Sequence, residues 1–295
     1  MVQHLVSRVV LRQWANWKNG PIGGLDMRSL EQRTDQVEKF AGLDDPGLNA
    51  PDATEKIWSD EVEVRLPHAF ARLKAGELLS DRAAMTTVKN CIALHWARGF
   101  VLTELTQQII PLKVEEITAS LTEQFSPQQI MSALTGVSLV SPDMSALLKQ
   151  RISADFTKKL ENERFMDEQF VVQYVKCKEL ISSHSLEIWH SNTDDFLIGD
   201  APVVSYNKED DKVGVLSGVS WDKADAIFMP LGPHHVVALA KTNTEREASP
   251  ANVEQFNAMQ VRGALREVFF RPDGGLGDII ANAIKKNEAK ANYIS

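Results

Sequence analysis

The sequence has little cysteine and no long apolar segment. Only Cys91 and Cys177 occur among the 295 residues. Two cysteines do not make a disulfide framework, neither has the spacing of a metal-binding motif, and we expect both to be buried, reduced thiols. No stretch reaches the roughly 20 apolar residues that a membrane-spanning helix needs, and the first residues do not resemble a secretory signal. The sequence therefore predicts a soluble, cytoplasmic protein without a membrane partner.

An excess of positive charge is also missing. Lys and Arg number 32 against 40 Asp and Glu, which gives a formal net charge of −8. This balance disfavours a protein that coats nucleic acid by neutralising phosphates, although an enzyme with a local basic groove or a metal ion is still compatible with it. The hydrophobic fraction of 43% is that of an ordinary globular protein. We predict a single domain over residues 1–295.

Familiar catalytic motifs are absent. The sequence contains no HExxH, CxxC or GxSxG pattern and no phosphate-binding loop. It also contains no internal repeat. Candidate functional residues must therefore be sought among polar side chains that lie on otherwise apolar faces.

The first two thirds of the chain have mainly helical patterns. A helical block runs from residue 52 to Gly76, and Pro67 should kink it or divide it. Apolar residues at helical spacing predict a long helix from about residue 81 to Pro111. Further helices are expected at residues 126–136 and from 141 to about 183, each opened by Ser-Pro.

Strand patterns begin near Leu186. The segments LEIWHS, DFLIGDAPVVSY, KVGVLS and DAIFMPLGPHHVVALAK are short, β-branched and aromatic, with turn residues between them. An amphipathic helix follows at residues 249–270. The predicted fold is α+β, with a mainly helical part over 1–185, then a small antiparallel sheet and a return helix with further C-terminal helix over 186–295.

Asp200 stands at the end of an apolar strand in DFLIGDAPVV, residues 195–204. The Ala-Pro that follows restarts the chain in an extended conformation. Asp200 is then either the polar residue of a turn between two strands, or a carboxylate that binds a metal or acts as a base at the edge of a site. The local sequence leaves both interpretations open.

His95 and Arg98 lie on the apolar side of the long helix, in one stripe with Cys91 and Leu102. An arginine is costly to bury unless a carboxylate pairs with it. The two residues form either a structural ion pair with a satisfied histidine, or a pocket in which Arg98 holds an anion and His95 transfers a proton. Both interpretations need an acidic partner, and Glu63, beside the apolar face of the preceding helix, is our candidate.

The remaining histidines carry weaker signals. His4 lies alone in a basic, apolar segment at the start of the chain. His234 and His235 follow PLGP at a turn into a strand, where alternation directs only one of the two side chains inward.

Several of these segments together resemble a known family. The sequence is similar to the mostly bacterial family called domain of unknown function 4238. The segments that carry the resemblance, in chain order, are His4 followed by LRQW, then EVRLPHAFARL, HWAR, FLIGDAP, PLGP and FNAMQVRGALREVFF. One departure is that SRVV stands where the family has a proline after the first histidine. The resemblance implies no activity, but it implies that a set of polar residues recurs together: His4, Glu63, His95, Arg98 and Asp200.

Two functions from different classes fit this set. The first is a hydrolase that acts on phosphodiesters, nuclease-like, of the toxin or phage-defence kind, with nucleic acid or a nucleotide as its substrate. Glu63 and Asp200 would bind Mg²⁺ or Mn²⁺, with His4 or His95 nearby, and the metal ion would activate water. Arg98 would stabilise charge on the phosphate.

The second is a non-enzymatic interaction protein. The same five residues would then form a buried network that fixes the sheet on the helices, and the surface would bind a partner protein from the same operon. A solvent-reachable cleft around the set favours the enzyme, and a closed, fully paired cluster favours the structural network.

Overall fold

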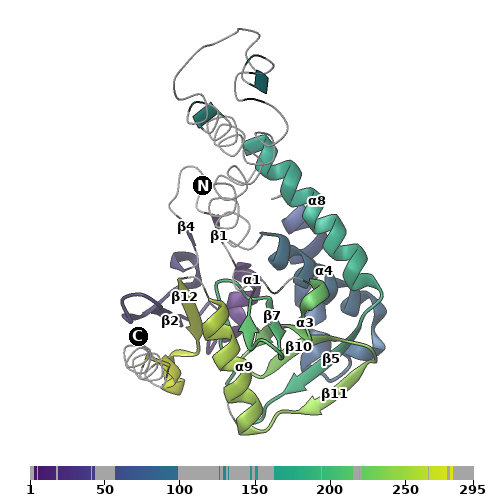
Figure 1. Ribbon diagram of the computed structural model, residues 1–295. Coiled ribbons are helices and arrows are strands. Elements are labelled where there is room, and N and C mark those ends of the chain that lie inside the picture. Colours follow the sequence, from purple (N-terminus) through teal and green to yellow (C-terminus); the bar gives the residue numbers. More distant parts are fainter. Residues whose placement is uncertain are drawn as a thin grey trace.

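The computed structural model defines two larger β-sheets and the helices that cover them (Figure 1). It describes residues 3–4, 6–17, 19–40, 42–43, 57–98, 126, 129–130, 132, 147, 150–151, 163–193, 195–214, 219, 221–264, 266–277 and 280–281. Most of the predicted helix at residues 126–136, most of the first half of the one from 141 to 183, the last part of the helix predicted to Pro111, and most of the C-terminal tail lie outside these residues. Within the described part, no helix is both long enough and apolar enough to cross a membrane.

The helices differ in length and type. The α-helices are α1 (Arg8–Leu11), α3 (Leu66–Lys74), α4 (Arg82–Arg98), α8 (Glu163–Ser182) and α9 (Pro250–Gly263). The shorter turns are the π-helix η3 (Ile57–Glu63) and the 3-10 helices η1 (Arg12–Trp14), η2 (Val37–Lys39), η4 (Leu78–Ser80), η6 (Trp221–Lys223) and η7 (Pro272–Gly274). Pro67 lies in the first turn of α3 and divides the block as expected. Gly76 has a φ of 67° just after α3, the conformation of a helix-terminating glycine.

The larger sheet has six strands in the order β11-β5-β10-β9-β7-β8. Its strands are β5 (Ser185–His190), β7 (Val204–Asn207), β8 (Lys212–Val213), β9 (Ala226–Gly232), β10 (His235–Ala240) and β11 (Thr244–Glu247). The pair β11–β5 is parallel and the other pairs are antiparallel. The sheet is therefore mixed.

Helices cover both faces of this sheet. Alternation along β9 and β10 sends one set of side chains into a core shared with α1, α3, α4 and α8, and this set includes Ile227, Met229, Leu231 and Val237. The opposite set packs against α9 and includes Val204, Phe228, Val236 and Ala238. Because both faces are buried here, the central strands β9 and β10 are nearly continuous apolar runs, whereas the edge strand β11 is polar and mostly exposed.

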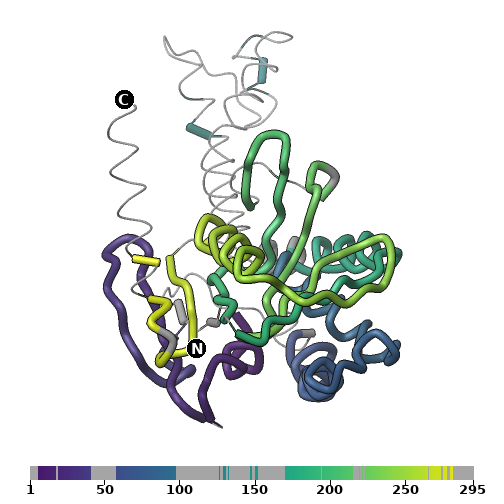
Figure 2. Tube along the Cα trace, turned by 90° about the horizontal axis from the view of Figure 1, so that it is seen from below, coloured from purple at the N-terminus to yellow at the C-terminus, as the bar shows by residue number. Residues whose placement is uncertain are grey.

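A second sheet joins the beginning and the end of the chain. Its four antiparallel strands have the order β3-β2-β12-β6, from β2 (Ile22–Asp26), β3 (Gln32–Asp35), β6 (Ile198–Gly199) and β12 (Glu267–Phe270). Figure 2 shows the N-terminal hairpin, in purple, beside β12, in yellow. Two short strands, β1 (Gln3–His4) and β4 (Gly42–Leu43), form a further pair.

The predicted fold class was wrong in two respects. The helices are not mainly N-terminal, because strands occur within the first 43 residues and α9 lies near the end of the chain. The sheet is not small or purely antiparallel, since sheets of six and four strands are present and β11 is parallel to β5.

The physical reason lies in the glycines of PIGG, residues 21–24, because such a cluster of proline and glycine is typical of a turn and yet forms part of β2. Gly23 and Gly24 lie in β2, and a Cβ there would come within 2.5 Å of the rings of Phe270 and Phe40, respectively. These aromatic rings cover the strand where side chains would otherwise stand. The partner strand β3 is mostly exposed, so its sequence has no apolar alternation.

We expect Gly24→Ala to destabilise the fold by about 1–3 kcal/mol, because the new methyl group overlaps the buried Phe40 ring. Chemical denaturation measures this loss. Gly232→Ala is the matched control, since a Cβ there meets only the Cβ of Gln13 at 3.6 Å. Equal stabilities for the two variants would contradict the packing described for β2.

Candidate functional site

Ser7 joins the start of the chain to the helical layer. It caps α1, where its hydroxyl accepts the N–H of Val9 at 3.2 Å. The same hydroxyl donates to the carboxylate of Glu63 in η3. The backbone N–H of Ser7 donates to Nε2 of His95 in α4 at 3.2 Å. One residue thus connects three segments that are far apart in the sequence.

His95 is buried, with 2% of its surface exposed. Its Nδ1 lies 2.8 Å from the carbonyl oxygen of Cys91, which can only accept a hydrogen bond. Its Nε2 accepts from Ser7, so Nε2 carries no proton. The imidazole is therefore neutral, with its proton on Nδ1. The ring also packs against the indole of Trp58, with 5.0 Å between their centres.

Glu63 is partly buried at the end of η3. Its Oε1 accepts from the indole N–H of Trp58 at 2.6 Å and from the Ser7 hydroxyl. Its Oε2 accepts no hydrogen bond from the residues that the structure describes. Burial and the nearby Glu63 charge together raise the pKa of the Cys91 thiol far above its ordinary value. We call Ser7, Trp58, Glu63, Cys91 and His95 the Glu63 cluster.

His4 and Arg98 lie close to this cluster along the backbone. His4 belongs to β1 and precedes Ser7 by three residues, while Arg98 is the last residue of α4, one turn beyond His95. The side chains of His4 and Arg98 lie outside the described part of the chain. Because Ser7 is hydrogen-bonded to both His95 and Glu63, the backbone segments that carry His4 and Arg98 come together near Glu63.

Asp200 belongs to the four-stranded sheet instead. Its Oδ2 accepts the backbone N–H groups of Arg266 at 2.9 Å and Glu267 at 3.3 Å, and its own N–H donates to the Glu267 carbonyl at 3.0 Å. The residue is 2% exposed. This geometry fastens the end of β6 to the start of β12. Asp200 therefore has the surroundings of a structural carboxylate, whereas Glu63 and His95 lie among the helices.

Two amide side chains of α9 hold the rest of the FLIGDAP segment. Asn257 accepts the N–H of Leu197 at 2.9 Å and donates to the carbonyl of Asp195 at 2.9 Å. Gln260 accepts the N–H of Gly199 at 2.8 Å and donates to the carbonyl of Pro202 at 3.0 Å. Both amides are buried, and no sequence motif marks them. In the sequence they appear as two polar residues, three apart, on the side of an amphipathic helix that should face the core.

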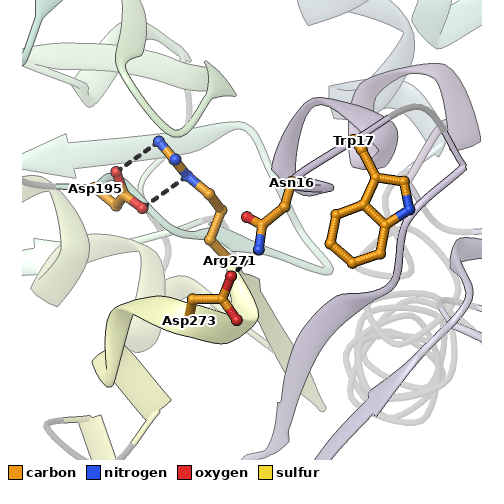
Figure 3. Close-up of a pocket in the computed structure, with 5 residues that line it drawn as sticks. All are labelled: Asn16, Trp17, Asp195, Arg271 and Asp273. Atoms are coloured by element: carbon orange, nitrogen blue, oxygen red, sulfur yellow. Dashed lines mark hydrogen bonds and ion pairs between the residues drawn. The ribbon is translucent and has the colours of Figure 1, made fainter.

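An open pocket of about 450 Å³ lies elsewhere on the surface, lined by Asn16, Trp17, Asp195, Arg271 and Asp273 (Figure 3). The guanidinium of Arg271 pairs with the carboxylate of Asp195 through two nitrogens, at 2.9 and 3.1 Å. The amide of Asn16 donates to Asp273. These residues come from three distant segments and match no motif, so no sequence pattern predicts the pocket.

The histidine pair 234–235 adjoins this pocket. Nε2 of His234 faces the guanidinium of Arg271, and burial together with this cation lowers the pKa of His234. His235 lies opposite His190 across β10 and β5, and burial, with a smaller effect of the neighbouring histidines, lowers its pKa to about 4. Both imidazoles are neutral at pH 7.

The described residues include no group of three or more His, Cys, Asp or Glu side chains that would hold a metal ion. Glu63 has the chemistry of a single oxygen ligand, because one of its carboxylate oxygens receives no hydrogen bond from the described residues. The carboxylate of Asp200 already accepts two backbone N–H groups through one oxygen.

The architecture is thus a mixed sheet between helical layers, with a polar cluster at the joint between the chain start and the helices. A family model covers nearly the whole of it: the chain belongs to the family described as protein of unknown function DUF4238, which matches residues 2–274. The predicted family membership is confirmed. No curated protein and no solved structure gives a significant match.

We expect Asp200→Ala to lower the free energy of unfolding by about 3 kcal/mol, because it removes the acceptor of two partly buried backbone N–H groups. Urea denaturation measures the change. In the control Asp210→Ala, an exposed carboxylate that pairs with Lys212 is lost, and the expected change is below about 0.5 kcal/mol. A fully stable Asp200→Ala protein would contradict the structural role of Asp200.

The lowered pKa of His235 makes stability depend on pH. Below pH 6.5, the ordinary pKa of histidine, His235 is protonated in the unfolded chain, whereas in the folded chain it becomes protonated only near pH 4. Stability is therefore lost as the pH falls through this window. We expect His235→Gln to flatten the dependence of unfolding free energy on pH between 6.5 and 4. The control His184→Gln, at an exposed histidine after α8, should keep the wild-type slope, and an unchanged slope in His235→Gln would refute the assignment.

Proposed function

We propose that the protein is a hydrolase of phosphodiesters that works at Glu63. The observation that carries the proposal is the state of this carboxylate: one oxygen is fixed by Trp58 and Ser7, and the other receives no hydrogen bond from the described residues. A carboxylate oriented in this way, and only partly buried, is prepared to bind a cation or to accept a proton.

Three residues near Glu63 in the fold or along the backbone have separate roles in the proposed reaction. His95 is a positioning residue, because both its ring nitrogens are engaged and it holds Ser7 in place for Glu63. Arg98 follows one turn later on α4 and would stabilise negative charge on the phosphate. His4, three residues before Ser7 in the chain, is the candidate proton donor.

The reaction is the attack of water on phosphorus. A bond forms between the water oxygen and phosphorus, the bond to the leaving oxygen breaks, and the proton lost by water passes to Glu63. The leaving alkoxide takes a proton from the acid, for which His4 is the candidate. Where Mg²⁺ or Mn²⁺ is present, Oε2 of Glu63 would hold the ion instead of accepting the proton, which would then pass to solvent. The ion would supply Lewis-acid stabilisation, and Mg²⁺ commonly uses only one or two carboxylates together with substrate phosphates. Asp200 is left out of the proposed metal ligands because of its bonds to β12.

A nucleic acid or a nucleotide is the proposed substrate class, and a toxin or phage-defence effector is the biological setting that we propose for such an activity in the cytoplasm. An acidic protein can act on these substrates only where positive charge is local, and Arg98 with a divalent ion would provide it.

One observation favours the alternative of a non-enzymatic interaction protein, for instance with a partner encoded in the same operon. His95 and Asp200 are each 2% exposed, so two members of the predicted set are enclosed, as a structural network would be. In that case, substitutions in the Glu63 cluster would lower stability without changing any hydrolytic rate.

The proposal predicts that Glu63→Gln abolishes hydrolysis and keeps the fold. Gln retains an acceptor for Trp58 but neither binds a cation nor accepts a proton, so we expect a loss of at least about 100-fold in kcat/KM. The assay is hydrolysis of bis(4-nitrophenyl) phosphate and of labelled single-stranded RNA and DNA, with Mg²⁺ or Mn²⁺ added.

The control is Glu254→Gln, which removes one exposed carboxylate from α9 and should leave the rate unchanged. Thermal unfolding of each variant separates loss of chemistry from loss of fold. A wild-type protein that hydrolyses none of these substrates with either metal, or a Glu63→Gln protein as active as wild type, would refute the proposed function.

A further inference from the structure

The pocket around Trp17 contains an aromatic platform. Trp17 is 62% exposed, which is unusual for an indole in a globular protein. One face of the ring lies over Gly20, where a Cβ would come 3.0 Å from Cδ2 and Cε2 of the indole. The turn is closed by the N–H of Gly20, which donates to the carbonyl of Trp17 at 2.8 Å. The indole is therefore held in place from below, and its exposure leaves surface for a ligand.

Donors and acceptors stand together beside this platform. Figure 3 shows Asn16 between the indole and the pair formed by Arg271 and Asp195. Asn16 uses one amide hydrogen on Asp273, which leaves its carbonyl oxygen and a second hydrogen for a ligand. Arg271 has donors beyond the two that face Asp195.

The polar groups are held by the fold. Asn257 of α9 binds the carbonyl of Asp195 at 2.9 Å and fixes the backbone of this residue. Asp195 in turn orients Arg271, which follows the last strand of the four-stranded sheet. Asp273 lies in the first turn of η7. The pocket thus joins the N-terminal segment, the FLIGDAP segment and the end of β12.

The charge of the lining excludes one class of ligand. Among the described lining residues are two carboxylates and one guanidinium, so these residues together carry a net negative charge that repels phosphates and other anions. A hydroxyl group both donates and accepts, and it suits a site in which carboxylates, an amide and a guanidinium alternate. The polarised C–H bonds of a saturated ring suit the negative face of an indole.

We propose that this pocket binds a neutral saccharide, with one face of the sugar ring on Trp17 and its hydroxyls on Asn16, Asp273 and Arg271. The volume of about 450 Å³ is within the range of small-ligand pockets. This inference concerns a site other than Glu63 and is independent of the proposed hydrolysis, so either can fail alone.

The test is saturation-transfer NMR and titration calorimetry of the full chain. The probes are methyl glycosides of common hexoses and the oligosaccharides of cellulose, chitin and starch, with adenosine and inorganic phosphate for comparison. We expect at least one saccharide to bind, with the strongest transfer to the C–H protons of one ring face. Neither phosphate nor adenosine should compete with it.

Two variants address the platform. Trp17→Ala should weaken saccharide binding by about tenfold or more. Gly20→Ala keeps every lining side chain but displaces the indole, so it should weaken binding as well. Leu180→Ala, at an exposed apolar residue on α8, is the control and should bind like the wild type.

Three results would overturn the inference. The first is that no saccharide of the panel binds the wild-type protein. The second is that Trp17→Ala, shown to be folded by its thermal unfolding, binds as tightly as the wild type. The third is that adenosine or phosphate, and not a saccharide, occupies the pocket.

Discussion

The hydrogen bonds of the segment at residues 195–202 hold the two sheets together. This stretch leaves the six-stranded sheet, forms β6 in the four-stranded sheet and returns to β7, and its backbone would be buried without partners along most of the way. Asn257 and Gln260 of α9 satisfy four of its polar groups, and Trp14 donates to the carbonyl of Phe196 at 2.8 Å. Asp200 completes the attachment by binding β12. The segment FLIGDAP, which carries part of the resemblance to the family, thus connects the two sheets.

The hydrogen bonds of the two carboxylates, Asp200 and Glu63, distinguish a structural residue from a candidate functional one. The carboxylate of Asp200 accepts hydrogen bonds from two backbone N–H groups, which stabilise its negative charge inside the fold. Glu63 receives two donors on one oxygen only. His95 supports Glu63 indirectly through Ser7, and its neutral, doubly bonded ring is suited to holding a position. Of the predicted set, the described side chains of Glu63 and His95 therefore belong to one group in space and that of Asp200 to another.

The sequence predicted the parts of the fold in which local pattern and tertiary packing agree. The division of the block at Pro67 and the buried free thiols are confirmed. The helix predicted over residues 249–270 begins after the cap residue Ser249, as α9, but it ends at Gly263, and its last predicted residues form the strand β12. Strand β2 was missed because aromatic rings from other segments replace its side chains at Gly23 and Gly24. The parallel β11 was missed because strand direction follows from long-range pairing and leaves no local signal. Of the candidate site, Glu63 was predicted as the acidic partner of the helix that carries His95 and Arg98, and the structure connects Glu63 to His95 through Ser7. Neither Ser7 nor the pocket at Trp17 was predicted, because both depend on contacts between residues far apart in the sequence.

The proposed function requires that a divalent ion binds at Glu63 and not at Asp200. Titration of isotope-labelled protein with Mn²⁺ tests it directly, because the paramagnetic ion broadens NMR signals near its site. If the ion binds at Glu63, the NMR signals of the Trp58 indole N–H and the Ser7 amide are lost selectively. The amide signals of Arg266 and Glu267, which donate to Asp200, remain sharp. Broadening centred on Arg266 and Glu267, or no selective broadening at all, would contradict it.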